Sequence, residues 1–389
     1  MQRIVIIGGG AVGSAIAYFL TQRPDPPQVW VVERDFAYRQ ASSALSASSI
    51  RQQYSTAVNI EISQFGIAFL RSIGTLLEVD GTRPDIGLTE PGYLYLASGE
   101  GQSVLRENHV LQKQFGADVA LLDMPALEAR FPWLSTEGLA LASLGLSGEG
   151  WFDGYGLMQA LRKKAIAQGV RYVQAEATGL QREARHILGV KLANGETLPC
   201  DVAVNAAGPW AARVAGWADI DLPVRARRRS VFSFSCPEPL PGCPLVIDRS
   251  GLWWRPEGRR FICGYSPAAE DDLDDLPLDE VPHAVFESEL WPILAGRVPA
   301  FEAVRMQGAW AGYYEMNVFD HNAILGLHPD CANLYFANGF SGHGLQQCPA
   351  ASRGMAELIR FGAFQSLDLS PLGFERILQN RPLLERNVI

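Results

Sequence analysis

The pattern of apolar and polar positions opens the chain with a strand, a turn and a helix. Residues 4–7 form a short, continuously apolar segment, which is typical of a strand buried in a parallel sheet. Apolar residues then recur at helical spacing over 11–21, and a second apolar strand over 29–32 ends in Glu33. These elements predict a βαβ unit at the start of the chain.

The same pattern predicts the later elements. Helical spacing indicates helices over 59–77, 104–115, 157–168 and 345–361, and short apolar runs indicate strands over 93–96, 170–173, 202–206 and 334–337. The Asn194-Gly195 turn indicates a hairpin between residues 187–192 and the strand that follows. Alternation is typical of antiparallel sheet over 230–234, 251–254 and 260–264. The segment 41–49, rich in Ser and Ala, is expected to be a loop or a helix start at a site.

We therefore expect an α/β protein (α+β overall) with two domains. The length of 389 residues is too great for one ordinary core. A Rossmann-type nucleotide-binding domain is expected from residues 1–80, 145–220 and 315–389. A substrate-binding domain with an antiparallel sheet is expected from residues 81–144 and 221–314, inserted into the first.

Composition narrows the class of partner. The formal net charge of −9 argues against general nucleic-acid binding, which needs a basic face, and favours a small-molecule partner. The six cysteines form no C-x-x-C pair, so no metal site is expected and separate thiols in a reducing compartment are favoured. No run reaches the roughly 18 apolar residues of a membrane span, and the uncharged residues 4–20 are better explained by strand, turn and helix than by a signal peptide. We therefore expect a cytoplasmic protein.

The first chemical motif is the glycine-rich turn G-x-G-x-x-G over residues 8–13. Gly8 permits the tight turn, Gly10 lets the backbone approach a pyrophosphate, and Gly13 lets the helix pack on the strand. The helix N-terminus attracts phosphates. Glu33 lies at the end of the next strand, where it can accept both hydroxyls of an adenosine ribose and would repel the 2′-phosphate of NADP. This motif alone leaves NAD and FAD open.

The second motif, Ala337-Asn-Gly-Phe-Ser-Gly-His-Gly344, also follows an apolar strand and precedes a helix. Its closely spaced glycines leave backbone N–H groups uncovered, which suits the carbonyl oxygens of a planar ring. A purely structural glycine-rich turn with His343 in solvent is the alternative.

Both motifs, with Val204-Asn-Ala-Ala-Gly-Pro-Trp210 between them, resemble the D-amino-acid oxidase superfamily of flavoproteins, which includes sarcosine oxidase, glycine oxidase and the FAD-bearing chains of some proline dehydrogenases. The resemblance runs through essentially the whole chain and implies FAD, with its isoalloxazine between the two domains. It also implies cofactor contacts along the chain, with Ser14 beside the pyrophosphate and the following further positions: Gly8, Gly10, Ala11, Val12, Gly13, Glu33, Arg34, Ser42, Ser43, Ser49, Ala177, Ala207, Gly208, Trp210, Gly312, Gly339, Ser341, Gly342, His343, Gly344, Leu345 and Gln346.

Two departures from the superfamily pattern change the expectation. Sarcosine oxidases attach the flavin to a cysteine just before their counterpart of Asn317, and no cysteine stands there in this chain, so FAD is expected to bind non-covalently. Those enzymes grip the substrate carboxylate with a lysine where this chain has Gln346, and a lysine associated with oxygen activation would fall near Ile262. Residues 50–54 and 344–347 are closer to proline dehydrogenase and related amine dehydrogenase chains.

A carboxylated substrate needs a cation in an otherwise apolar pocket, and Arg51 and Arg255 are the candidates. Tyr313, His343 and Gln346 are the other candidate catalytic residues, and Tyr314 is a further candidate for the pocket wall. The basic run 225–229 is interpreted as a solvated turn, and the acidic residues 270–275 as a solvated loop.

The expected activity is FAD-dependent oxidation of the C–N bond of a small amine or amino acid, with a secondary amine or N-substituted amino acid favoured. Hydride passes to flavin N5 and an imine forms, and molecular oxygen or an electron carrier then takes the electrons. The alternatives are the FAD-bearing subunit of a multi-subunit dehydrogenase, a non-catalytic assembly factor, or an NAD-dependent dehydrogenase. The oligomeric state stays open.

Overall fold

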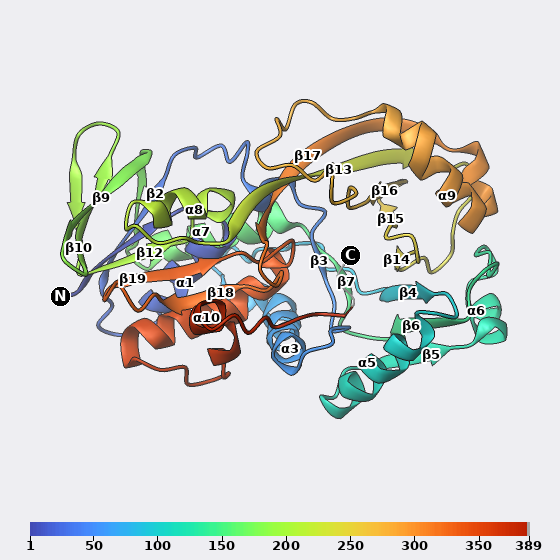
Figure 1. The fold of residues 1–389 in the computed structure, drawn as a ribbon, viewed down its shortest axis with the longest axis horizontal. Helices are drawn as coiled ribbons and strands as arrows, with labels where there is room; N and C mark the ends of the chain where they lie inside the picture. The colour runs from blue at the N-terminus through green and yellow to red at the C-terminus, as the bar shows by residue number, and fades with distance from the viewer. Residues whose placement is uncertain (387–389) are drawn as a thin grey trace.

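The computed structural model describes residues 1–386, which form two lobes that lie side by side (Figure 1). One lobe contains a six-stranded sheet in the order β18-β19-β12-β1-β2-β8. Its strands are parallel except for β18, which pairs antiparallel with β19. The bounds are β1 (Arg3–Ile7), β2 (Gln28–Glu33), β8 (Arg171–Gln174), β12 (Val202–Asn205), β18 (Ile324–Leu327) and β19 (Leu334–Asn338).

Both faces of this sheet are buried, which explains the continuously apolar strands. Ile4 and Ile6 pack against helices on one face, whereas Val5 and Ile7 pack against a small second sheet and α8 on the other. The helices are α1 (Ala11–Thr21), α3 (Ala57–Arg71), α7 (Gly154–Ala167) and α10 (Gly344–Phe361). The opposite face has α8 (Ala211–Gly216) and the strands β9 (Ala177–Glu183), β10 (His186–Leu192) and β11 (Thr197–Pro199). The predicted Rossmann-type α/β fold is confirmed, including the hairpin across Asn194-Gly195.

The other lobe contains an eight-stranded sheet in the order β17-β13-β16-β15-β14-β4-β6-β5. It is antiparallel except between β4 and β14. The long strands β13 and β17 pair along their whole length and reach from one lobe into the other (Figure 1). The bounds are β4 (Tyr93–Ala97), β5 (Val119–Leu122), β6 (Leu141–Gly145), β13 (Val224–Ser235), β14 (Leu245–Ile247), β15 (Trp253–Glu257), β16 (Arg260–Gly264) and β17 (Arg305–Asn317).

Alternation along β4 separates the two faces of this sheet. The helices of this lobe are α5 (Gln102–Gln114), α6 (Met124–Arg130), the π-helix η2 (Phe286–Leu290) and α9 (Trp291–Arg297). Leu94 and Leu96 join a large core with residues of α6, η2 and α9. Tyr93 and Tyr95 lie on the opposite face with Leu105 of α5 and with Leu245, Ile247 and Trp253. Short elements complete the chain: α2 (Ser42–Leu45), β3 (Ser49–Ile50), α4 (Ile73–Leu76), β7 (Gly150–Trp151), η1 (Gly208–Trp210), η3 (Pro299–Ala303), η4 (Ser370–Leu372) and α11 (Glu375–Leu378).

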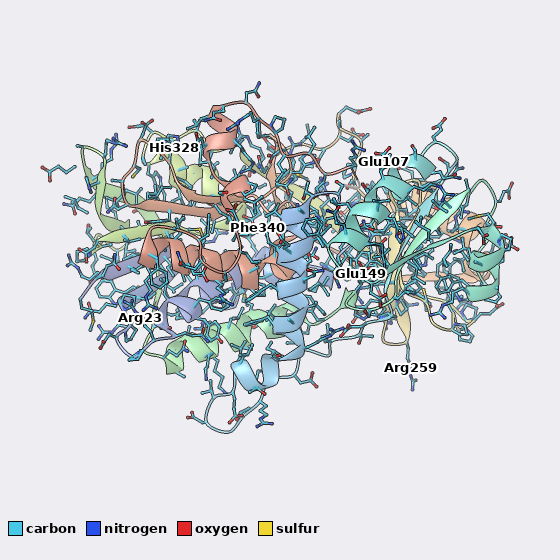
Figure 2. All side chains as sticks on the ribbon, turned by 90° about the horizontal axis from the view of Figure 1, so that it is seen from below. Arg23, Glu107, Glu149, Arg259, His328 and Phe340 are labelled. Atoms are coloured by element: carbon cyan, nitrogen blue, oxygen red, sulfur yellow. The ribbon has the colours of Figure 1, made fainter. Side chains whose placement is uncertain are left out.

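Figure 2 shows Glu149 and Phe340 toward the middle of the molecule, whereas Arg259 projects from the tip of the β15–β16 hairpin. Glu149 is a fully buried carboxylate, and Phe340 is buried in the core of the first lobe. The region where the lobes meet therefore contains polar groups with no access to solvent.

The interpretation of the basic run is wrong. Residues 225–229 are part of β13 and form no turn. The acidic segment folds back over this strand, so that Asp272 pairs with Arg229 and Asp274 pairs with Arg227. Each segment by itself predicts a solvated surface, but in the structure their opposite charges pair with each other along β13. Sequence periodicity also missed β5, β6, β9 and the helices over 286–297.

Within residues 1–386, every helix is too short or too polar to cross a membrane.

Candidate active site

A cavity of about 860 Å³ lies between the two sheets and brings together residues from distant parts of the chain. It is within the usual size range of a small-molecule or cofactor site. Nearly all of the sequence-predicted site residues line it: Gly8, Gly10, Ala11, Val12, Glu33, Arg34, Ser42, Ser43, Ser49, Arg51, Ala177, Ala207, Gly208, Trp210, Gly312, Tyr313, Ser341, Gly342, His343, Gly344, Leu345 and Gln346. Gly13, Gly339 and Arg255 do not line it.

The glycine-rich turn forms one end of the cavity. Gly8 has a φ of +104°, and an added Cβ there would overlap the carbonyl oxygen of Ala206. An added Cβ on Gly13 would overlap the carbonyl oxygen of Gly8, so this glycine lets α1 pack on the turn, as expected from its place in the motif. Ser14 does not line the cavity. It is fully buried, and its hydroxyl donates to the carbonyl of Gly9. Its expected contact with a pyrophosphate is therefore replaced by a structural one.

The first turn of α1 is free to bind an anion. Among residues 1–386, the N–H groups of Gly10, Ala11 and Val12 donate to no acceptor of the chain, and the helix has no side-chain cap and no acidic residue in its first turn. Glu33 closes the other side of the turn, since its two carboxylate oxygens accept the N–H groups of Gly9 and Asp35, both at 2.9 Å. These contacts aim Glu33 into the cavity beside the helix N-terminus, where unpaired N–H groups favour phosphate.

The second glycine-rich loop, residues 339–344, forms another wall. Gly339, Ser341 and Gly342 all have positive φ angles, and an added Cβ on Gly342 would overlap the ring of Tyr314. In the described part of the chain, the N–H groups of Gly342, Gly344 and Leu345 have no acceptor. They are therefore free to receive an oxygen at the N-terminus of α10.

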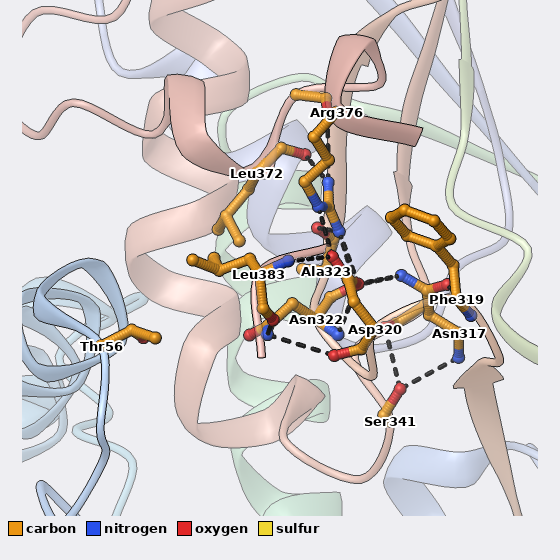
Figure 3. Close-up of polar contacts among 12 residues, drawn as sticks. Thr56, Asn317, Phe319, Asp320, Asn322, Ala323, Ser341, Leu372, Arg376 and Leu383 are labelled. Atoms are coloured by element: carbon orange, nitrogen blue, oxygen red, sulfur yellow. Dashed lines mark hydrogen bonds and ion pairs between the residues drawn. The ribbon is translucent and has the colours of Figure 1, made fainter. Parts of the chain in front are cut away.

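A buried polar network fixes this loop from behind (Figure 3). The hydroxyl of Ser341 accepts the N–H of Asn317 at 3.0 Å, and Asn317 donates to Asp320 at 2.8 Å. Asp320 forms a buried ion pair with Arg376 at 2.7 Å and accepts the N–H of Leu383 at 3.0 Å. The loop is thereby tied to the C-terminal segment of the described chain.

The structure directs Arg255 away from the cavity. Its guanidinium donates to the carbonyl of Ala47 at 2.6 Å and pairs with Glu257. Trp310 donates to the carbonyl of Leu45, and Ser42 donates to the carbonyl of Tyr313. Arg255 therefore helps to hold the 41–49 segment against the second lobe, and the expectation that it contacts a substrate carboxylate has no support from its position.

Arg51, in contrast, presents a buried cation to the cavity. Its side chain is only 5% exposed, and its guanidinium bonds the hydroxyl of Tyr95 and the Nε2 of His343, the latter at 3.0 Å. Among residues 1–386 it pairs with no carboxylate, and its Nε has no partner. The rings of Tyr54 and Tyr95 lie 4.5 and 5.7 Å from the guanidinium carbon. The negative charges of Glu149 and Glu385 act on Arg51 without direct contact. A buried cation with no carboxylate in ion-pair contact is costly, so this geometry favours an anionic ligand.

Two residues hold the backbone around Arg51. Gln346 lines the cavity, and its side-chain oxygen accepts the N–H of Arg51 at 2.9 Å. Glu149 accepts the N–H groups of Gln52 at 2.6 Å and Gln53 at 3.0 Å. Burial raises the pKa of the Glu149 carboxyl to about 7, and the hydrogen bonds from Gln53 and Gln52 partly oppose this rise.

Sequence reasoning missed part of the cavity wall. Tyr93, Leu245, Ile247 and Trp253 line it from the eight-stranded sheet, and Arg229 lines it from β13. The alternating tyrosines at 93 and 95 were a signal that a polar-tipped face pointed inward. For Arg229 the signal was hidden in the basic run, and its charge is paired with Asp272 at 2.6 Å.

His343 is kept neutral. Burial lowers its pKa well below the usual value, and the neighbouring Arg51 cation lowers it further. The neutral imidazole can accept from Arg51, which leaves the arginine as the positive group of this pair.

Tyr313 also lines the cavity. Its hydroxyl donates to the carbonyl of Leu276, and the centroid of its ring lies 6.0 Å from that of Trp210, edge to face.

A family model described as FAD dependent oxidoreductase (DAO) matches residues 3–358. The chain belongs to this family. It is 42% identical over 422 residues to "FAD-dependent oxidoreductase domain-containing protein 1" of Xenopus laevis, covering 99% of this chain and 84% of that protein. It is 25% identical to glycine oxidase of Geobacillus kaustophilus, covering 96% of each. The crystal structure of L-proline dehydrogenase from P. horikoshii shares the fold, with a TM-score of 0.86 at 24% identity over 98% of this chain and 99% of that one.

FAD is the cofactor of this DAO-family protein, and the residues present fit it. Free N–H groups at the start of α1 suit a pyrophosphate, and the Glu33 carboxylate beside them suits a ribose. The free N–H groups of the 342–345 segment suit the carbonyl oxygens of a flavin ring at the opposite wall. The resemblance to the D-amino-acid oxidase superfamily is thereby confirmed, and an NAD-dependent dehydrogenase is set aside.

Proposed function

We propose that this protein oxidises the C–N bond of a small amine that carries a carboxylate, with a secondary amine or N-substituted amino acid as the favoured substrate. The observation that carries the proposal is Arg51, a buried guanidinium that lines the cavity and has no carboxylate partner among residues 1–386. A substrate carboxylate supplies the negative charge that Arg51 lacks and forms charge-assisted hydrogen bonds with its guanidinium. An amine without a carboxylate would leave this arginine unpaired.

The proposed place of FAD follows from the two sets of free N–H groups. The pyrophosphate lies at Gly10, Ala11 and Val12, and Glu33 holds the adenosine ribose. The other expected contacts are assigned to the remaining lining residues, with Ala177 at the adenine, Gly208 and Trp210 beside the flavin, and the 341–346 segment at its pyrimidine end. None of the six cysteines lines the cavity, which supports non-covalent binding.

FAD supplies the hydride acceptor when it is bound. Arg51 fixes the substrate carboxylate, and Glu149 and Gln346 hold the backbone that carries Arg51. Tyr93, Leu245, Ile247 and Trp253 form an apolar wall that excludes water around the reacting carbon. Burial and the Arg51 cation both lower the pKa of His343, so the imidazole adds no second positive charge beside Arg51.

The test is an anaerobic titration of the purified, FAD-loaded protein with matched pairs of amines. N-methylglycine and proline are each compared with the counterpart that lacks the carboxylate, dimethylamine and pyrrolidine. We expect the visible flavin band to bleach with the carboxylated member of a pair at concentrations where the other member has no effect. Equal bleaching within each pair would contradict the assignment of Arg51, and no bleaching with any amine would support an assembly factor or a subunit that needs partners.

Aerobic assays of peroxide and of an artificial electron acceptor, run in parallel, then separate an oxidase from a dehydrogenase.

We also propose a cytoplasmic location for this protein, which cell fractionation tests directly.

A further inference from the structure

A buried carboxyl without an ion pair among residues 1–386 lies against the glycine-rich loop 339–344. Glu315 is in β17, lines the cavity, and is 8% exposed. Its side chain accepts the N–H of Gly339 at 3.1 Å, and its main-chain carbonyl accepts the N–H of Ser341 at 3.1 Å. This strand and this loop are therefore held together through a group that carries charge when it is ionised.

Glu315 has no cation to balance it. In the described part of the chain it forms no ion pair, and its carboxyl accepts only from backbone N–H groups, those of Gly339 and Phe340. Its Oε1 lies 3.5 Å from the position of a Cβ added to Gly344, at the N-terminus of α10. That terminus has no acidic residue in its first turn. The carboxyl therefore lies beside the helix end that is free to receive the flavin's pyrimidine oxygens.

The charged and titratable groups on the elements packed against Glu315 are otherwise engaged. Its register partner in β13 is Ala226, and the arginines of β13 bond to residues 272–280 of the folded-back acidic segment or to nearby carbonyls. His343 is held neutral by burial and bonds to Arg51. The titratable groups on β13, on β17 next to Glu315 and on the adjoining loops include Arg225, Arg227, Arg228, Arg229, Tyr313, Tyr314, His321 and His343. Burial raises the pKa of Glu315 to about 8, against the lowering effect of the two backbone hydrogen bonds.

We propose that Glu315 is a positioning residue that also takes up one proton when the bound flavin is reduced. Reduction by two electrons and one proton leaves one negative charge, which develops at the pyrimidine end of the ring. A second negative charge on Glu315, buried beside the same helix N-terminus, would repel it. Binding of one solvent proton to the Glu315 carboxylate removes this repulsion, so that two electrons and two protons are taken up together when Glu315 starts ionised.

The proposal rests on FAD binding and is independent of the amine substrate, because a chemical reductant replaces the substrate in its test. The midpoint potential of the FAD-loaded protein is measured by reductive titration against reference dyes at pH values from 6.5 to 9.5. For a two-electron couple, each proton taken up contributes about 30 mV per pH unit. We expect the slope of the wild-type protein to steepen from about 30 to about 60 mV per pH unit once Glu315 is ionised in the oxidised state.

The wild-type measurement is decisive by itself, since a constant slope over the whole range would overturn the proposal even if no variant folds. Glu315→Gln keeps an acceptor for the backbone N–H groups but cannot ionise. We expect it to keep the one-proton slope throughout, and to match the wild-type potential at pH 6.5 while exceeding it increasingly toward pH 9.5. Glu315→Asp retains the titratable group and should retain the change of slope.

A variant slope that steepens as in the wild-type protein would assign the proton to another group and overturn the proposal. Binding of FAD is followed by the absorbance spectrum and by thermal unfolding, so a loss of cofactor is distinguished from a change of potential. Failure of the amine titration with a normal potential profile would contradict the proposed substrate and leave the role of Glu315 intact.

Discussion

Replacement of Arg51 by Met removes the buried cation and keeps an unbranched apolar stem of similar length. In the wild-type protein the guanidinium bonds Tyr95 and His343 and lies over the ring of Tyr54. It has no carboxylate partner among residues 1–386. In the unliganded protein, the variant therefore loses the contacts of the guanidinium with uncharged partners. It also no longer buries a cation that has no carboxylate in contact.

These terms have opposite signs, so the free energy of unfolding should change by no more than about 2 kcal/mol. The effect on a carboxylated ligand is larger. A hydrogen bond to a charged group contributes about 1.5–3 kcal/mol, and a tenfold change in affinity corresponds to about 1.4 kcal/mol. We expect Arg51→Met to weaken binding of a carboxylated amine by about 10- to 150-fold, and to leave binding of the decarboxylated counterpart nearly unchanged.

Arg255→Met is the matched control. Arg255 is as buried as Arg51, at 4% exposed, but its guanidinium holds Ala47 and Glu257 and does not line the cavity. This variant should lose about 1–3 kcal/mol of stability, because the carbonyl of Ala47 loses a buried donor. It should weaken both members of an amine pair by the same factor.

The assay is the anaerobic titration of flavin absorbance with both members of a pair, and the ratio of their dissociation constants is compared among the three proteins. The reasoning is refuted if Arg51→Met keeps the wild-type ratio, or if Arg255→Met loses it to the same extent.

Three further outcomes are expected. Gly342→Ala places a Cβ at a left-handed φ of +92°, where it overlaps the ring of Tyr314, so the affinity for FAD should fall at least tenfold. Gly362→Ala is the control, because its φ is also positive, at +73°, but no atom lies within 4 Å of the added Cβ. It should lose about 1 kcal/mol of stability and keep its affinity for FAD. Glu33→Gln can accept only one of its two backbone N–H groups and should weaken FAD binding, measured by fluorescence, about tenfold. The raised pKa of Glu315, about 8 instead of 4.5, means that the native state holds a proton which the unfolded chain has released. The free energy of unfolding of the apoprotein in urea should therefore fall as the pH rises from about 4.5 to about 8, by up to about 1.4 kcal/mol per pH unit, and this contribution should level off above pH 8. A stability that rises between pH 7 and 8, or a fall of equal size there in Glu315→Gln, would contradict this sign.

The cofactor, and the glycine-rich segments proposed to hold it, could be inferred from the sequence because these segments are local. The turn from Gly8 to Gly13 and the acid at Glu33 belong to one βαβ unit, and backbone sterics fix where each glycine lies. The 339–344 loop is equally local, since its positive φ angles lie between one strand and one helix. Continuous apolar runs likewise specified the buried parallel strands.

The substrate half could not be predicted in the same way. Arg51 and Arg255 are both arginines next to apolar segments, and only their tertiary partners separate an arginine that faces the cavity from one that holds a loop. The basic run on β13 and the acidic segment after residue 269 each looked solvated, because a charged residue is solvated unless a distant segment folds over it.

The sequence by itself therefore determined the fold class, the family and the cofactor, whose binding depends on backbone conformation within short segments. Only the tertiary structure decided which charges are compensated. Arg51, Glu149 and Glu315 come from three different strands or loops. They are buried where the two lobes meet, and among the described residues none of them has an ion-pair partner. Electrostatic energies depend on distance and solvent access in space, and no local pattern of residues encodes either quantity.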